Sequence, residues 1–141
     1  MSQSLKFILI LFVALALVSC SGPKTISRDQ LRSDLLAALS LASETELFIG
    51  QLQEGRVTTS FAKGHLEYLR KEALRNADQL GQVRADGRMA GQLEKGRAQL
   101  DFLVTLLADL KDKSADEETL SAGKEQAEKI RLILEHVKDE L

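Results

Sequence analysis

The sequence predicts an all-α protein: an antiparallel up-down-up-down four-helix bundle that follows a cleaved signal peptide. Two observations predict this fold class. The chain is rich in Leu, Ala, Glu, Lys and Arg, which favour helix, and its single proline is Pro23, near the start. After that proline, four segments carry apolar residues at alternating steps of three and four, the spacing of a helix that packs against others at a shallow angle.

The first element is a secretory signal peptide over residues 1–19. A short polar start with one cation, Lys6, precedes twelve apolar residues, Phe7 to Val18. A membrane-spanning helix needs about 20 such residues. A cationic start, a short apolar centre and a small residue before the cut are instead typical of an exported precursor. We therefore expect cleavage between Ser19 and Cys20.

The four residues Leu17-Val18-Ser19-Cys20 resemble the bacterial lipobox. The resemblance implies that Cys20 receives a diacylglyceryl group on its sulfur and becomes a new N-terminus, whose amine is acylated in many bacteria. It also implies an exported, membrane-anchored protein. Because Ser21 rather than Asp follows the cysteine, the resemblance favours an anchor on the periplasmic face of the outer membrane if the source has two membranes. An ordinary signal peptide, or an uncleaved anchor, with a chance cysteine is the alternative.

Cysteine usage and chain length agree with this interpretation. Cys20 is the only cysteine, so no intramolecular disulfide can form, and lipidation would account for a lone thiol in an exported protein. One acyl chain holds a protein only marginally, whereas two or three hold it firmly. Residues 20–26 are predicted to be a short lipidated tether, and residues 27–141 a single domain of ordinary size.

The first predicted helix covers residues 27–54. Ser27 and Gln30 have the spacing of a capping box, and Ile26 and Leu31 that of a hydrophobic staple. Gly55 suits the left-handed position after the helix. The predicted core positions are Leu31, Leu35, Ala38, Ala42, Thr45, Ile49 and Leu52, with Leu36, Leu39, Leu47 and Phe48 widening the apolar face.

A second helix is predicted over residues 59–85, beginning after possible caps at Thr58, Thr59 and Ser60. Its end is ambiguous, because Gly81 could end it whereas the apolar pattern continues to Val83, ahead of the turn at Gly87. The predicted core positions are Ala62, Leu66, Leu69, Ala73, Asn76, Leu80 and Val83, flanked by Tyr68 and Ala77.

Helices over residues 88–112 and 115–140 complete the bundle, with a capping box expected at Ser114 and Glu117. The third helix repeats the pattern with Met89, Leu93, Gly96, Leu100, Leu103, Leu107 and Leu110, thickened by Phe102, Val104 and Leu106. The fourth does so with Leu120, Gly123, Ala127, Ile130, Leu134, Val137 and Leu141, beside Leu132 and Ile133. Short connections make neighbouring helices antiparallel. Open hairpins paired between two molecules remain an alternative, so monomer and dimer are both open.

No catalytic set stands out, and we expect a protein that is not an enzyme, with no metal site and no cofactor beyond the lipid on Cys20. Neither histidine has a glutamate three residues earlier, as di-iron bundles require. A b-type haem could take His136 and Met89, or His65 and Met89, as axial ligands. His136 is expected to be a solvated surface residue and Met89 a core residue.

Three glycines inside predicted helices are unusual, because each costs about 1 kcal/mol relative to alanine. Gly91, Gly96 and Gly123 could border a groove for a partner helix or acyl chain. Close packing of neighbouring helices is the interpretation favoured for them. Seven cations lie between residues 70 and 97: Arg70, Lys71, Arg75, Arg84, Arg88, Lys95 and Arg97. They could form a basic face, or they could pair with the acidic last helix. The pairing is the favoured interpretation.

A formal net charge of −2 does not favour nucleic acid or an anionic membrane as the main partner. We expect a membrane-anchored, non-enzymatic envelope lipoprotein whose bundle binds another protein of unknown identity. The first alternative is a bundle that carries a small apolar ligand or b-type haem. The second is a structural or stress-related envelope lipoprotein without a discrete ligand.

Overall fold

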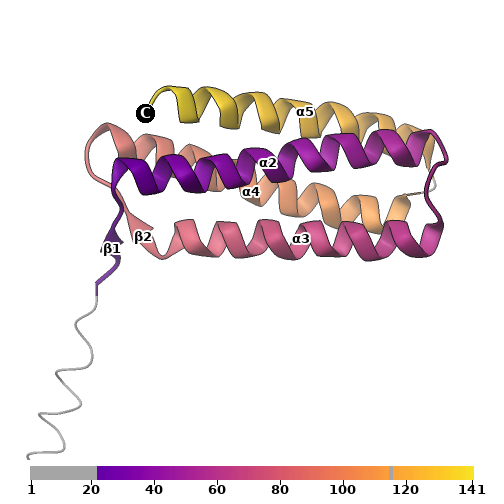
Figure 1. Cartoon of the computed structure of the whole chain (residues 1–141), viewed down its shortest axis with the longest axis horizontal. Coiled ribbons are helices and arrows are strands. Elements are labelled where there is room, and N and C mark those ends of the chain that lie inside the picture. The colour runs from indigo at the N-terminus through magenta and orange to yellow at the C-terminus, as the bar shows by residue number, and fades with distance from the viewer. Residues whose placement is uncertain (1–21, 115) are drawn as a thin grey trace, which may run out of the picture.

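The computed structural model of the chain describes residues 22–114 and 116–141. The predicted signal peptide, its cleavage site at Ser19 and the lipidation site at Cys20 therefore lie outside the described residues. The described residues form four long helices, which lie side by side with a short extended segment at one end of the bundle (Figure 1). The helices are α2 (Arg28–Gln53), α3 (Thr59–Gly81), α4 (Arg88–Lys113) and α5 (Glu117–Asp139).

Consecutive helices run in opposite directions, which confirms the predicted antiparallel four-helix bundle. α2 packs most extensively against α5, and α3 against α4. The α4–α5 contact is intermediate, whereas α2 and α3, although consecutive in the chain, share a thinner contact. One chain closes the bundle by itself, so the open-hairpin arrangement is not needed to bury the apolar faces.

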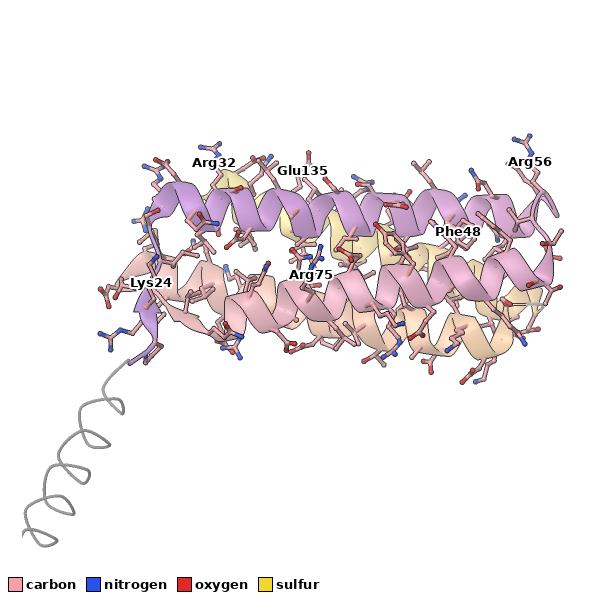
Figure 2. The ribbon with its side chains drawn as sticks, turned by 60° about the horizontal axis from the view of Figure 1, so that its bottom comes forward. Lys24, Arg32, Phe48, Arg56, Arg75 and Glu135 are labelled. Atoms are coloured by element: carbon pink, nitrogen blue, oxygen red, sulfur yellow. The ribbon has the colours of Figure 1, made fainter. Side chains whose placement is uncertain are left out.

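The core consists of the apolar positions that recur every three or four residues. Leu31, Leu66, Leu100 and Leu134, one from each helix, are fully buried. Leu52, Asn76, Val83 and Met89, at or near helix ends, are only half-buried. By length and apolarity α2 could cross a membrane, but its buried residues face the other three helices. Side chains on the outer faces are mainly charged or polar (Figure 2).

Helix caps confirm two predicted starts. The Ser27 hydroxyl accepts a hydrogen bond from the backbone N–H of Gln30 at 3.2 Å, and that of Thr58 accepts from Phe61 N–H at 3.3 Å. Ile26 and Leu31 are both buried, as a staple requires. Gly55 has φ +66°, the left-handed conformation expected just beyond the helix.

The predicted cap of the last helix is wrong. α5 begins at Glu117, and its cap is Asp116, whose carboxylate accepts from Thr119 N–H at 2.9 Å. Ser114 instead follows the last turn of α4. An aspartate cap adds a full negative charge at the positive end of the helix dipole, which favours it over a neutral serine two residues earlier.

α3 ends at Gly81 and not at residue 85, which is a second correction. The next residues, β2 (Val83–Arg84), pair in parallel with β1 (Lys24–Thr25). Ile26 N–H then donates to the Arg84 carbonyl at 2.8 Å, and the Ile26 side chain is buried. Part of the segment predicted to be a free tether is therefore bound to the end of the bundle, because extended backbone at 83–84 offers hydrogen bonds that a longer helix would keep for itself.

Several apolar residues predicted to widen the core face solvent. Leu36 and Leu47 on α2 are exposed. Tyr68, Phe102 and Leu132, expected beside the apolar seams of their helices, are more than half exposed. Four helices of this length supply enough leucine at the inner positions to fill the interior, so these side chains remain outside. An isolated exposed leucine is ordinary, whereas grouped exposed aromatics indicate an interaction surface.

Candidate functional site

The thin contact between α2 and α3 leaves a groove along the outside of the bundle. Near β1 it holds a hollow of about 610 Å³, and further along a second of about 400 Å³; both are lined by Asp34 and Gln79. The second hollow extends along the helices as far as Glu44 on α2 and Glu72 on α3. We call this feature the α2–α3 groove.

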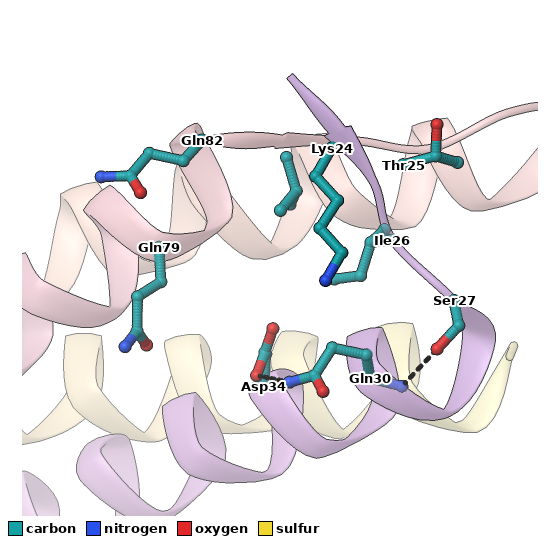
Figure 3. A pocket seen from close by; sticks show the side chains of 9 residues that line it. Lys24, Thr25, Ile26, Ser27, Gln30, Asp34, Gln79 and Gln82 are labelled. Carbon is teal, nitrogen blue, oxygen red and sulfur yellow. Dashed lines mark hydrogen bonds between the residues drawn. The ribbon is translucent and has the colours of Figure 1, made fainter. Parts of the chain in front are cut away.

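Polar side chains line the first hollow (Figure 3). The Gln30 amide donates to Asp34 Oδ1 at 2.8 Å. Gln79 and Gln82 approach from α3, and Lys24 from the docked segment. Amides, one carboxylate and one ammonium group in an open hollow can bind water or a polar chain.

An aromatic cluster lies where α2 and α3 meet beyond the second hollow, nearer the loop that joins the two helices. His65 lies at its centre, with ring centroids 4.4 Å from Phe48, 5.7 Å from Phe61 and 5.9 Å from Tyr68. The Phe61 and Tyr68 rings are stacked with the imidazole, within 7° and 27° of its plane. His65 Nε2 also lies 3.2 Å from Glu44 Oε1 on α2. We call these four rings the aromatic cluster.

The members of the aromatic cluster differ in how far their rings are exposed to solvent. Phe48 is buried and anchors the group to the core, whereas Phe61 is 57% exposed and Tyr68 is 53% exposed. Ring pairs at these distances contribute about 0.5–1.5 kcal/mol beyond their burial, so neighbouring rings hold the exposed ones in place. Rigid, accessible aromatic side chains are the groups most enriched at protein interfaces.

Sequence reasoning missed this cluster because its residues come from two helices and each was assigned separately. The sequence predicts Tyr68 as a flank of the core and His65 only as a possible haem ligand. One signal was available: Phe61, His65 and Tyr68 recur at steps of four and three, so they share one face of a helix. That Phe48 of α2 meets this face required the tertiary structure.

Of the two pairs considered for haem, His136 and Met89 lie toward the same end of the bundle, whereas His65 and Met89 do not. His136 is largely exposed and its Nε2 lies 3.2 Å from Glu140 Oε1, as expected of a surface histidine. Met89 is half-buried against the core in the first turn of α4. His65 lies at the opposite end of the bundle from Met89, because α3 and α4 are antiparallel. The described residues contain no group of three or more His, Cys, Asp or Glu side chains placed to hold a metal ion.

Gly91, Gly96 and Gly123 do not border a shared groove. A methyl group on Gly96 would lie 2.5 Å from Leu35 Cδ2, and one on Gly123 would lie 2.9 Å from Leu110 Cδ2. Both glycines are buried with leucine side chains beside them, and Gly123 also lines a hollow of about 330 Å³ between α4 and α5. Gly96 in particular lets α2 and α4 approach across the centre of the bundle. Gly91 is exposed, with no atom within 4 Å of such a methyl group.

Most cations of the predicted basic face pair within α3 and α4 and not with α5. Glu67 accepts hydrogen bonds from Arg70 at 2.8 and 3.0 Å, and from Lys111 of α4 at 3.0 Å. These bonds, first from Arg70 and then from Lys111, lower the pKa of the Glu67 carboxyl to about 2. Among the predicted cations, Lys95 reaches beyond these two helices, to Glu140 at 3.5 Å.

A smaller apolar hollow of about 350 Å³ lies between α4 and α5. Phe102, which is largely exposed, forms its rim, and Leu106, Ile130 and Ile133 contribute apolar surface. Polar residues such as Gln126 and Lys129 complete its edge. This shape suits a small apolar group better than the polar hollows of the α2–α3 groove do.

The chain was compared with protein-family models, with curated proteins and with solved structures. None of the three comparisons finds a match.

Proposed function

We propose that this protein is an exported lipoprotein, anchored to a bilayer through Cys20, whose bundle binds another protein without catalysing a reaction. The anchor is supported by the apolar segment and by the four residues that resemble a lipobox. Binding is supported by the aromatic cluster. Anchoring would place the protein on the periplasmic face of the outer membrane if its source has two membranes.

The contact of residues 24–26 with the end of the bundle shortens the proposed anchor. Because Lys24 and Thr25 pair with β2 and Ile26 is buried, only residues 21–23 separate Cys20 from the folded domain. Three extended residues span at most about 11 Å. An anchored bundle would therefore stay against the headgroups instead of moving freely on a flexible linker.

The observation that carries the binding role is the exposure of Phe61 and Tyr68. Two large rings, each more than half accessible, are stacked against His65, which itself packs against the buried Phe48. Exposed aromatic groups of this kind are costly to leave in water and bury well against a partner. The aromatic cluster also lies at the end of the bundle away from β1, and hence away from the proposed anchor.

The anchor is tested with Cys20→Ala in cells given labelled fatty acid. We expect the wild-type chain to incorporate label and the variant to accumulate as an unlabelled precursor. Continued labelling of the variant would contradict the anchor. A wild-type chain that is recovered unlabelled in the soluble fraction would do the same.

The binding role is tested with two matched glycine variants, Gly64→Arg and Gly91→Arg. Both glycines lie in helices and are exposed, and neither has an atom within 4 Å of an added Cβ. Gly64 lies between Phe61 and Tyr68 on α3, whereas Gly91 lies on α4. After crosslinking in membranes and immunoprecipitation, a stoichiometric partner should be lost with Gly64→Arg and kept with Gly91→Arg. Equal recovery from both variants would contradict binding at the aromatic cluster.

The hollow between α4 and α5 supports one alternative, a bundle that carries a small apolar ligand. Its rim residue Phe102 is exposed, so Phe102→Ala should leave the fold intact while removing one wall. A fluorescent fatty-acid analogue titrated into the protein checks this alternative. Saturable binding weakened by Phe102→Ala and unaffected by Gly64→Arg would favour the ligand role over the protein-binding role.

A further inference from the structure

Six exposed residues of α3 form a stripe at the spacing of a helix–helix contact. They follow one another at steps of three and four on the side of the helix that faces solvent: Phe61, Gly64, Tyr68, Lys71, Arg75 and Asp78. Steps of this kind bring residues into line along one side of a helix. α3 therefore carries a buried seam inside the bundle and a second, exposed one, which we call the outer stripe.

The side chains of the outer stripe change from aromatic to charged along the helix. Its first half is aromatic, with Phe61 and Tyr68 on either side of the open space at Gly64. Its second half is charged, with the two cations Lys71 and Arg75 followed by Asp78. Both cations are exposed, and among the described residues they form ion pairs within α3, with Glu67 and Glu72. Exposed pairs of this kind contribute little.

We propose that the outer stripe binds the outer stripe of a second copy of this chain, with the two α3 helices antiparallel. This inference rests on the proposed function, since it names the partner of the same aromatic cluster. A two-fold axis between Tyr68 and Lys71 sets Tyr68 opposite Lys71 of the partner subunit. It also sets Gly64 opposite Arg75 of the partner subunit and Phe61 opposite Asp78 of the partner subunit. A contact of this type is isologous, so each pairing occurs twice.

Charge and shape both favour this arrangement. An ammonium or guanidinium group over an aromatic face is attracted to it, and the attraction grows as water is excluded. The open space at Gly64 accommodates the long stem of an arginine. A parallel arrangement would instead set Lys71 against Lys71 and Arg75 against Arg75, which is repulsive.

The test measures self-association of the full-length chain in detergent micelles by sedimentation equilibrium over a range of concentrations. We expect a reversible dimer for the wild-type chain and for the control Gly91→Arg. Gly64→Arg alone places an arginine opposite the partner's Arg75, and Arg75→Glu alone removes the cation. Each should weaken dimerisation about tenfold or more.

The decisive variant combines Gly64→Arg with Arg75→Glu. Within one chain these positions are eleven residues, about 16 Å, apart along the helix, so they cannot compensate each other internally. Across an antiparallel pair they would meet as opposite charges and restore the dimer. A wild-type chain that stays monomeric, or a double variant as weak as the singles, would overturn the inference. Loss of a different protein with Gly64→Arg would still support the proposed function.

Discussion

The inner seam and the outer stripe of α3 have the same residue spacing but opposite environments. Leu66 and Leu69 of the inner seam are fully buried against the other helices. Phe61 and Tyr68 of the outer stripe are held by neighbouring rings but remain more than half exposed. Spacing alone therefore identifies a surface suited to a neighbouring helix, and the tertiary structure decides whether that neighbour belongs to the same chain.

The glycines within the helices also differ in environment, some being buried and others exposed. Gly96 and Gly123 are covered by leucine side chains, whereas Gly64 faces open space between two aromatic rings. A glycine in a helix costs about 1 kcal/mol relative to alanine. At Gly96 the contact with Leu35 of α2 offsets that cost, whereas at Gly64 no atom of the described residues lies near enough to offset it.

The largest expected effect separates the core from the exposed surface. Leu103→Ala removes a fully buried side chain and should lower the free energy of unfolding by about 2–5 kcal/mol, because a cavity remains. Phe61→Ala, on the outer stripe, should change it by no more than about 1 kcal/mol, since a largely exposed ring loses only its stacking energy. Urea denaturation followed by circular dichroism measures both. Similar losses of stability for the two variants would mean that the outer stripe is packed as tightly as the core.

A second variant tests the close approach at Gly96. Gly96→Leu puts new atoms where Leu35 already lies, and overpacking of this kind should destabilise the fold by about 1–3 kcal/mol. Gly91→Leu on the same helix is the control, because its side chain would extend into open space. Thermal unfolding should show a lower melting temperature for the first variant and an unchanged or higher one for the second. A stabilised Gly96→Leu would indicate that a gap exists there.

A smaller, pH-dependent effect is expected where Glu67 joins α3 to α4. Its folded pKa is lowered to about 2, below the ordinary value near 4.3. The carboxylate therefore stabilises the fold above the ordinary value, and that contribution is lost as pH falls through the folded pKa of about 2. Glu67→Gln should be less stable than wild type at neutral pH, with the difference shrinking between about pH 4.5 and 2. Unfolding curves at several pH values check this; a constant difference would contradict it.

The smallest effect concerns the open glycine of the outer stripe. Gly64→Ala should stabilise the chain by up to about 1 kcal/mol, because alanine is the better helix former and the new methyl group meets no atom. Gly55→Ala should do the reverse, since Gly55 has φ +66°, a conformation that alanine adopts at a cost. Differential scanning calorimetry resolves both shifts. A destabilised Gly64→Ala would mean that its face is already occupied.

Local sequence patterns predicted the four helices, most of the core and two of the caps. These features depend on residues within one or two turns of each other, such as Ser27 with Gln30 or Leu31 with Leu35. The prediction failed where two local signals competed. Asp116 displaced Ser114 as the cap of α5, and the apolar pattern through Val83 extended α3 past its true end at Gly81.

What the sequence determined by itself is the helical bundle, because side-chain periodicity repeats within each helix and needs no distant partner. The expected anchor at Cys20 is likewise a property of the sequence. Only the tertiary structure decided that residues 24–26 dock against residues 83–84, that α2 packs more closely on α5 than on α3, and that Phe48 meets His65. Each of these contacts joins residues far apart in the chain, and their pairing depends on how complete helices fit together.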